Sequence, residues 1–473
     1  MAPDINWTPL AESLAGELIL PEQAAYEWTR KPFIARFDDI EPAVVVMCAT
    51  PQDVAEALSF ARRHDLEIAL RSGGHCFAGY SSTRGMLINV TPMNDITVDA
   101  GTAKVGAGTR IGAMTHALID HGAVVPSGSC PSVGVGGTTL GGGIGILGRL
   151  FGLSCDHVTE AEVVLADGRT IVTDHERDPD LLWALRGAGG GNFGVVTSLT
   201  FRTHPAPRMT NFFYEWDFED AAEVLKTWQR WAPAAPEEMT AGLGFTAMED
   251  LAEPPIVELF GAMAGTESDT LKLLDDFVER IGRPPAKTQC QEMSYRETAF
   301  YQAGLLSAVN NEVLETPTGV IERQGCRFTK SEFFARPVPD EAIERLCAVF
   351  PVGRTPGEVR GLEIAPWGFG YARVDARASA FAHRDVSFSL KHAIMVPPNA
   401  ADGTKQDAHR WITGSWETVH PWGTGRVYPN FPDPDLSDWG SAYYGENFAR
   451  LRQIKAAYDP GNTFRFQQSI PVG

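Results

Sequence analysis

Three glycine-dense segments before residue 200 constrain the fold of this chain more than any other feature. They are Gly73-Gly74, Gly134–Gly145 (GVGGTTLGGGIG) and Gly187–Gly194 (GAGGGNFG). Glycine tolerates positive φ and lets main-chain N–H groups approach a phosphate closely, so such loops can cradle a pyrophosphate. One run alone is more often a tight turn or a packing contact. Three runs in one region favour a bound dinucleotide.

The longest of these segments does not carry the usual dinucleotide fingerprint. That fingerprint places GxGxxG directly after a strand and at the start of a helix, with an acidic residue about 20 positions later. Here Gly134–Gly145 follows Pro126–Pro131 (PSGSCP), which is turn-like. The sequence therefore fails the test for that type of site.

Hydrophobic patterning predicts two different regions, separated at Pro205–Pro207 (PAP), because prolines interrupt helices and strands alike. Before it we expect strands at 42–48, 66–71, 86–90 and 103–105, a hairpin at 163–172, and helices at 51–64, 111–121 and 179–187. After it, strands at 241–245, 257–260 and 386–392 and helices at 217–231, 268–281 and 340–350 predict an α+β layer. From about Arg426 a proline-punctuated loop precedes a helix at 445–458.

Length and composition exclude several classes of protein. A chain of 473 residues exceeds one typical core, which favours two domains or one interrupted domain. A net charge of −20 argues against a nucleic-acid partner, and no apolar run is long enough for a membrane span. The first residues lack a basic stretch followed by an apolar one, so we expect no secretory signal and a cytoplasmic location. Seven scattered cysteines without a CxxC pair indicate neither a disulfide framework nor a zinc site, and we expect no metal.

Four ordered motifs carry a resemblance to a known family: RSGGHCFAGYSS (71–82), GSCPSVGVGGTTLGGGIGILGRLFGLSCDHV (128–158), RGAGGGNFGVVTSLTF (186–201) and YYGENFARLRQIKAAYDPGNTFRFQQSIP (443–471). With them the chain resembles the berberine bridge enzyme-like flavoproteins of the vanillyl-alcohol oxidase and p-cresol methylhydroxylase (PCMH) superfamily. The resemblance implies an α+β fold and FAD as cofactor. It implies a two-subdomain PCMH-type FAD-binding domain (1–205), a substrate-binding domain with a helix-covered antiparallel sheet (206–425), and a C-terminal segment (426–473) that returns to the FAD domain.

The resemblance also implies that FAD is bound by two covalent bonds. His75 matches the histidine bonded to the flavin 8α carbon, and Cys130 matches the cysteine bonded to C6. Imidazole and thiolate are the good nucleophiles for such bonds, and a second tether withdraws electrons from the ring. Cys76, which adjoins the motif histidine, is interpreted as structural. The predicted FAD contacts are Arg71, Ser72, Gly73, Gly74, His75, Cys76, Tyr80, Gly128, Cys130, Val133, Gly134, Gly136, Gly137, Thr138, Leu140, Gly141, Gly145, Asp156, Gly191, Asn192, Gly194, Val196, Asn430 and Gln467.

The catalytic base departs from the family pattern. Many members end a Tyr-x-Asn-Tyr motif with a tyrosine base, whereas this chain has Tyr428-Pro-Asn-Phe431, and phenylalanine cannot take a proton. Tyr428 is then the nearest phenol, although its pKa of about 10 would have to be lowered. The strand 387–392 (SFSLKH) offers Lys391 and His392 as rivals on opposite faces, each more often structural than catalytic.

The implied reaction is an oxidation of a small molecule. We expect hydride transfer from an alcohol or amine carbon of a bulky secondary metabolite, with O2 reduced to hydrogen peroxide. Val133 matches the position that governs oxygen access, where valine favours an oxidase, and Thr138 stands where many members carry histidine. The alternatives are an oligosaccharide or other alcohol oxidase, a dehydrogenase with another acceptor, or a flavin-binding protein that has lost its activity, as Phe431 suggests. We expect substrate and O2 as partners, no nucleic acid or membrane, and a monomer or homodimer.

Overall fold

The computed structural model describes residues 5–306, 311–316 and 319–473. Mostly apolar residues form its first sheet, in which β2 (Val44–Met47), β4 (Met86–Asn89) and β3 (Ile68–Arg71) run parallel. β1 (Glu17–Ile19) adds an antiparallel edge, giving the order β1-β2-β4-β3. A capping box of Thr50 and Asp53 begins helix α3 (Pro51–Arg63). This sheet positions the first glycine segment, since β3 ends at Arg71, directly before it.

A second, antiparallel sheet shares a hydrophobic core with the first. Its order is β5-β6-β10-β8-β9, with β5 (Ile96–Asp99), β6 (Thr102–Gly106), β10 (Val195–Arg202), β8 (Val158–Val164) and β9 (Thr170–Asp174). The predicted hairpin is β8–β9, and Gly168 in its turn has a φ of +90°. The same region contains α4 (Ile111–Asp120), α7 (Pro179–Leu185) and the unpredicted α5 (Val135–Leu140), which lies inside the second glycine segment. We call these two sheets and their helices the first unit.

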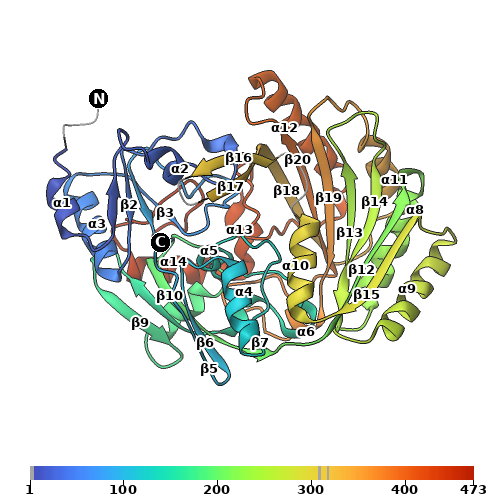
Figure 1. Ribbon diagram of the computed structural model, residues 1–473, viewed down its shortest axis with the longest axis horizontal. Coiled ribbons are helices and arrows are strands. Elements are labelled where there is room, and N and C mark those ends of the chain that lie inside the picture. The colour runs from blue at the N-terminus through green and yellow to red at the C-terminus, as the bar shows by residue number, and fades with distance from the viewer. Residues whose placement is uncertain (1–4, 307–310, 317–318) are drawn as a thin grey trace.

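A seven-stranded antiparallel sheet forms the other half of the molecule, which we call the second unit (Figure 1). Its strands, in spatial order, are β15 (Lys287–Met293), β12 (Met209–Asp217), β14 (Ile256–Met263), β13 (Met239–Ala247), β19 (Val359–Pro366), β20 (Phe388–Val396) and β18 (Cys326–Phe334). Helices α8 (Ala221–Trp231), α9 (Glu267–Ile281) and α11 (Asp340–Val349) pack on one face and form a second core. The structure confirms the predicted α+β fold with a helix-covered antiparallel sheet.

The remaining elements are shorter or lie at the margins of these sheets. They are α1 (Thr8–Ser13), α2 (Tyr26–Arg30), β7 (Ala123–Val124), α6 (Gly148–Phe151), β11 (His204–Pro205), α10 (Tyr295–Leu306), β16 (Asn311–Thr316), β17 (Gly319–Gln324), α12 (Asp402–Glu417), α13 (Trp439–Tyr444) and α14 (Phe448–Tyr458). α12 packs on β20 and β18. The predicted helix at 217–231 begins only at Ala221, because β12 continues to Asp217.

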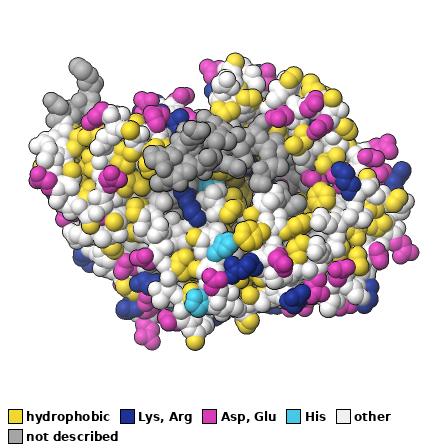
Figure 2. Space-filling model, in the orientation of Figure 1, with side chains coloured by type: hydrophobic (Ala, Val, Ile, Leu, Met, Phe, Trp, Pro, Cys, Tyr) yellow, Lys and Arg dark blue, Asp and Glu magenta, His cyan; other side chains and the backbone are white. Residues whose placement is uncertain are grey.

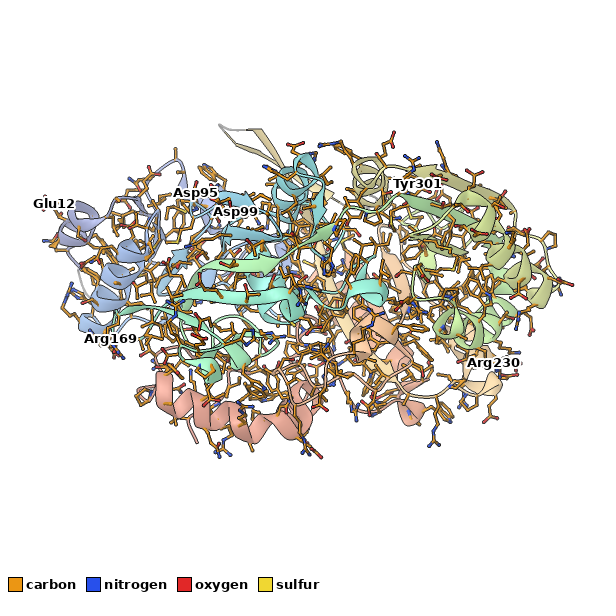
Figure 3. The ribbon with its side chains drawn as sticks, turned by 90° about the horizontal axis from the view of Figure 1, so that it is seen from below. Glu12, Asp95, Asp99, Arg169, Arg230 and Tyr301 are labelled. Atoms are coloured by element: carbon orange, nitrogen blue, oxygen red, sulfur yellow. The ribbon has the colours of Figure 1, made fainter. Side chains whose placement is uncertain are left out.

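The C-terminal segment returns to the first unit, and α14 lies along it in Figures 1 and 3. The fully buried Lys455 fixes this return, since its ammonium donates to Asp459 Oδ2 at 2.7 Å and to the carbonyls of Asn192 and Phe464. Figure 3 also shows how elongated the molecule is, with Glu12 near one end and Arg230 near the other. Helices α1 and α14 thus both belong to the first unit.

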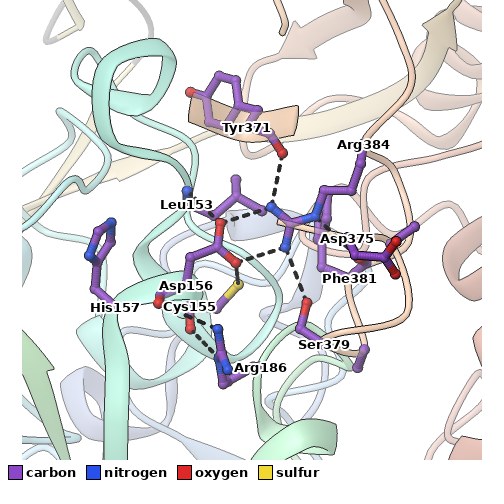
Figure 4. A network of polar contacts seen from close by, with 12 residues as sticks. Leu153, Cys155, Asp156, His157, Arg186, Tyr371, Asp375, Ser379, Phe381 and Arg384 are labelled. Carbon is purple, nitrogen blue, oxygen red and sulfur yellow. Dashed lines mark hydrogen bonds and ion pairs between the residues drawn. The ribbon is translucent and has the colours of Figure 1, made fainter. Parts of the chain in front are cut away.

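A buried ion pair joins the two units (Figure 4). The Arg384 guanidinium donates to both carboxylate oxygens of Asp156, at 2.7 and 2.8 Å, and both side chains are 4% exposed. The same guanidinium donates to the Tyr371 carbonyl at 3.0 Å and to Ser379 Oγ at 3.1 Å. Asp156 lies just before β8, whereas Arg384 lies just before β20, so the pair fixes the second unit against the first.

Acidic side chains are scattered over the whole face shown in Figure 2, as the net charge of −20 leads one to expect. The negative potential of such a surface attracts cationic small molecules and repels anionic ones at long range. None of the described helices combines the length and the hydropathy that a membrane span requires.

Candidate functional site

One large cavity, with a volume of about 580 Å³, lies where the open face of the seven-stranded sheet meets the first unit. Its first wall includes parts of all three glycine segments and the C-terminal residues Phe464, Arg465, Phe466 and Gln468. Its second wall consists of β12, β13, β14, β19 and β20. The volume lies in the range typical of small-molecule and cofactor sites. We call this space the central cavity.

The first glycine loop holds His75 on the cavity wall. Arg71 anchors the loop, because its guanidinium donates to Ser81 O and Ser82 Oγ on the far side of the turn. The His75 ring stacks on Phe33 with centroids 3.7 Å apart. Burial, together with the charge of Arg110, lowers the pKa of His75 to about 3. The imidazole is therefore neutral at physiological pH, which is the nucleophilic form.

Arg110 connects the two loops that carry His75 and Cys130. Its Nη1 donates to the Gly73 carbonyl at 2.7 Å and to the Ser132 carbonyl at 2.8 Å. Cys130 is half-buried and lies 3.5 Å from Ser132 Oγ, and its neighbour Ser129 lines the cavity whereas Cys130 itself does not. Burial lowers the pKa of Arg110, and the Cys130 sulfur opposes that shift. Sequence reasoning missed Arg110, which adjoins no motif.

The glycines of the three segments divide into two groups. Gly73 and Gly134 press their backbones together and leave no room for a Cβ at either position. By contrast, a Cβ at Gly137 would meet no atom within 4 Å, and Gly190 and Gly191 have only ordinary contacts at 3.7 Å or more. The first group therefore packs loop against loop, and the second leaves an open surface of main chain on the cavity wall.

The polar groups of this wall fit a dinucleotide. Tyr80 and Ser81 line the cavity, and their hydroxyls are buried without a hydrogen-bond partner in the described part of the chain. Such groups require a partner, because burying an unpaired hydroxyl is costly. The main chain at Gly137, Gly190 and Gly191 lines the same cavity and is open toward it. The residues present thus fit FAD.

Most of the predicted FAD contacts line the central cavity: Arg71, Ser72, Gly73, Gly74, His75, Cys76, Tyr80, Val133, Gly134, Gly136, Gly137, Thr138, Leu140, Gly145, Gly191, Asn192, Gly194, Val196 and Asn430. Five others lie outside its lining: Gly128, Cys130, Gly141, Asp156 and Gln467. Gly141 packs directly against the Asn430 side chain. Asp156 is engaged by Arg384, and Gln468 lines the cavity next to Gln467.

Tyr428 lines the cavity, but its hydroxyl is turned toward the protein. The phenol oxygen accepts from Gly143 N and from Asn430 Nδ2, each at 2.8 Å. Burial raises the pKa of Tyr428 to about 12, against the effect of these donors. A phenol with this pKa is a weak candidate for a base at neutral pH.

The two candidates on β20 point in opposite directions, as strand alternation predicts. His392 is fully buried on the helix-covered face, where its Nδ1 lies 2.9 Å from Ser415 Oγ, and burial lowers its pKa to about 3. Lys391 lines the cavity, with its Nζ 4.8 Å from the centre of the Phe431 ring. The structure thus brings Lys391 and Phe431 together and separates His392 from the cavity.

Glu363 is a cavity residue that the sequence did not predict. It lies opposite Lys391 across β19 and β20, and the two side chains form an ion pair. The Glu363 side chain is 46% exposed, whereas that of Lys391 is 10% exposed. Burial opposes ionisation, but the charges of Lys391 and Arg327 prevail and hold the pKa of Glu363 below its usual value. Glu363 therefore presents an ionised carboxylate to the cavity.

Comparisons with known proteins agree with this geometry. Residues 42–174 match the family described as "FAD binding domain", and residues 427–471 match "Berberine and berberine like". The chain is 32% identical over 437 residues to the FAD-linked oxidoreductase YgaK of Bacillus subtilis, with 91% of each chain covered. The structure of Physcomitrella patens BBE-like 1 matches with a TM-score of 0.88 and 26% identity over 99% of this chain and 100% of that one.

A second solved structure, a chitooligosaccharide oxidase, matches with a TM-score of 0.85 and 25% identity, covering 98% of this chain and 99% of that one. The two family matches include the first two glycine segments and the C-terminal residues of the first wall, whereas the third glycine segment lies outside them. Together with the relative of 32% identity they identify the cofactor as FAD and the protein as an enzyme. The chain belongs to the berberine bridge enzyme-like FAD-linked oxidoreductases.

Proposed function

We propose that the protein is an oxidase that removes a hydride from an alcohol or amine carbon of a bulky small molecule and reduces O2 to hydrogen peroxide. The observation that carries this proposal is the Glu363–Lys391 pair, which lies on the wall of the central cavity that belongs to the second unit. The first wall carries the residues that fit FAD. A substrate between the two walls would meet a hydride acceptor and a proton acceptor at once.

The chain would hold FAD with the main chain of the glycine segments and with covalent bonds at His75 and Cys130. FAD, when bound, accepts the hydride of the substrate carbon and passes the electrons to O2. Each bond replaces a hydrogen of the flavin and so requires a two-electron oxidant, which O2 supplies. The neutral His75 ring and the Arg110 contacts between the two loops support this arrangement.

Glu363 would take the proton from the reacting hydroxyl or amine. It is ionised at neutral pH and faces the cavity, whereas the Tyr428 phenol is occupied by two donors and has a raised pKa. Lys391 would act on Glu363 by keeping it ionised and fixing its orientation. Since the pair offers a proton acceptor, Phe431 does not by itself imply a loss of activity.

Val133 lines the cavity and supports O2 as the acceptor, because valine at this position favours an oxidase by the family resemblance. A dehydrogenase is the alternative. The division of the chain into 1–205, 206–425 and 426–473 remains a prediction, with the sheets supporting a boundary near Pro205. An oligosaccharide substrate is the second candidate, favoured by the similar fold of the chitooligosaccharide oxidase.

The test is a two-step experiment on the holoenzyme. The flavin is first reduced without oxygen by an accepted substrate, or by light and a chemical reductant, and is then mixed with air-saturated buffer in a stopped-flow instrument. Rapid return of the oxidised spectrum with one hydrogen peroxide per flavin supports the oxidase. Slow reoxidation would instead indicate a dehydrogenase, and the absence of reduction by any alcohol or amine would indicate a lapsed flavoprotein.

A further inference from the structure

A row of charged residues crosses the open face of the seven-stranded sheet. In the register of the strands, Glu215 lies opposite Glu258, which lies opposite Gly244. Gly244 in turn lies opposite Glu363, and Glu363 opposite Lys391. Residues directly opposite each other project to the same face of a sheet. Three carboxylates and one ammonium therefore share this face, and three of the four groups line the central cavity.

All but one of these charges are paired within the protein. Lys287 on β15 binds Glu215 at 2.7 Å, at the edge of the sheet. Lys391 binds Glu363. Glu258 receives one hydrogen bond, from Thr246 Oγ1 at 2.8 Å, and forms no ion pair with any residue in the described part of the chain. Glu258 is thus the charge of the row that lacks a counter-ion.

The surroundings make this lack of a cation costly. Glu258 is half-buried, and burial raises its pKa; the Glu215 carboxylate adds to this effect, whereas the Thr246 hydrogen bond and the more distant charge of Lys287 oppose it without cancelling it. The basic residues that line the cavity do not compensate, since Lys391 is paired and Arg71 and Arg465 belong to the wall of the first unit. A carboxylate held in such a place is stabilised by a cation that enters the cavity.

Aromatic rings continue the same face beside Glu258. Phe260 follows two residues along β14 and so projects to the same side, and Phe213 on β12 lies directly opposite it. Both rings line the cavity. An aromatic face attracts a cation and also accepts an apolar ring, so this corner combines charge recognition with a hydrophobic surface.

We propose that Glu258 binds a protonated amine of the substrate, whose apolar or aromatic body lies along Phe213 and Phe260. This inference deepens the proposed function by naming the chemical class of substrate, and it rests on that function. The amine would be remote from the reacting carbon, because β14 and β19 are separated by β13 and neighbouring strands lie about 4.8 Å apart. The ammonium and the group facing Glu363 would thus be about 10 Å apart.

Glu215 provides a matched control for the experiment. It carries the same charge on the neighbouring strand and on the same face, but it is paired with Lys287 and does not line the cavity. Tyramine and tyrosol provide matched probes, because they share a phenol body and differ only in an amine against a hydroxyl. Binding is measured by anaerobic calorimetry on the holoenzyme, so that affinity is read independently of turnover.

We expect tyramine to bind the holoenzyme at least about tenfold more tightly than tyrosol, an effect typical of close charge pairs. Glu258→Gln keeps the hydrogen-bonding shape but removes the charge, and we expect it to abolish this preference while leaving tyrosol unaffected. Glu215→Gln should keep the preference. Equal affinity for the two probes, no tyramine binding, or the same loss for both probes in Glu258→Gln would overturn the proposal.

The binding role of Glu258 and the proposed oxidase function can be refuted separately. A holoenzyme that releases peroxide from neutral alcohols without preferring tyramine retains the proposed function and refutes the role of Glu258. A holoenzyme that prefers tyramine through Glu258 but never reduces its flavin retains the binding role and refutes the oxidase. Calorimetry measures the preference for tyramine, and the flavin spectrum measures oxidation of the substrate. Both measurements use the same preparation of holoenzyme.

Discussion

Lys391 and Glu363 face each other from the neighbouring strands β20 and β19, with their charged ends in contact on the wall of the central cavity. The Phe431 ring lies beneath Lys391, with its centre 4.8 Å from Nζ, so the residue that replaces the expected tyrosine packs on this pair. We propose that the Glu363 carboxylate serves as the proton acceptor, since phenylalanine cannot.

Replacing Glu363 by glutamine should slow substrate oxidation without emptying the flavin site. General-base catalysis contributes about 10²–10⁴-fold, so we expect the rate of anaerobic flavin reduction to fall by that factor in Glu363→Gln. Stopped-flow absorbance measures this rate. Glu215→Gln is the control, since Glu215 lies in the same row but does not line the cavity. A reduction rate unchanged in Glu363→Gln would exclude Glu363 as the base.

The same pair predicts a pH dependence. The pKa of Glu363 is held below its usual value of 4.5 by Lys391 and Arg327 against the effect of burial, so the active, ionised form is lost only in acid below that value. Lys391→Met removes the largest lowering charge, and burial then raises the pKa. We expect the acid limb of flavin reduction to move to higher pH in Lys391→Met and to vanish in Glu363→Gln. An acid limb that stays in place in Lys391→Met would contradict this coupling.

The proposed double covalent attachment of FAD predicts a pattern in acid-precipitated protein. Yellow colour should stay with the precipitate in the native chain and in each single variant, His75→Ala and Cys130→Ala, because one bond remains in each. It should be lost in the double variant. Absorbance of the washed precipitate and peptide mass mapping measure the two bonds. Loss of colour in either single variant would show that only one bond exists.

Arg110 should control the second bond, because its contacts with Gly73 O and Ser132 O hold the Cys130 loop beside the His75 loop. We expect Arg110→Met to lower the fraction of protein linked through Cys130 while the link through His75 persists, as measured by peptide mapping. The control is Arg169→Met, whose side chain is 70% exposed and forms an ion pair with the nearby Asp167. Full double attachment in Arg110→Met would assign Arg110 a purely structural role.

Local sequence signals account for the parts of the fold that were predicted. The capping box of Thr50 and Asp53 and the proline that follows Thr50 determine where α3 begins, and the strand at 42–48 follows from a continuous apolar run. The glycine segments located the first wall of the cavity. The sequence could not distinguish glycines that pack against other backbone, such as Gly73, from glycines that open onto the cavity, such as Gly137. The difference depends on which atoms lie opposite each glycine in the folded chain.

Non-local pairing accounts for what was not predicted. Alternation along β20 correctly separated Lys391 from His392, but it could not reveal that β19 places Glu363 opposite Lys391, because strand register across a sheet is set by tertiary packing. For the same reason the alignment of Glu258 with Glu363 through Gly244 has no sequence signature. Asp156, predicted as an FAD contact, forms an ion pair with Arg384, which lies 228 positions later in the chain.

The ion pair of Asp156 and Arg384 contributes to the stability of the molecule, beside other contacts between the units such as the hydrogen bonds of Arg149 to the carbonyls of Trp367 and Ala235. Both side chains of the ion pair are 4% exposed, and removing one member leaves the other charge buried without its counter-ion. Such losses cost about 3–5 kcal/mol, whereas an exposed pair is worth about 0–1 kcal/mol. We therefore expect Asp156→Asn to lower the urea midpoint markedly, and Asp180→Asn, which breaks the exposed pair with Arg450, to leave it nearly unchanged.

Tryptophan fluorescence and flavin absorbance, followed together during urea unfolding, measure this effect and show where it acts. Because Asp156 belongs to the first unit and Arg384 to the second, separation of the units should open the central cavity. In Asp156→Asn we expect the flavin signal to change before the tryptophan signal of the second core, which contains Trp216, Trp228 and Trp231. Coincident transitions with an unshifted midpoint would mean that the units are held together by their apolar contacts and not by this ion pair.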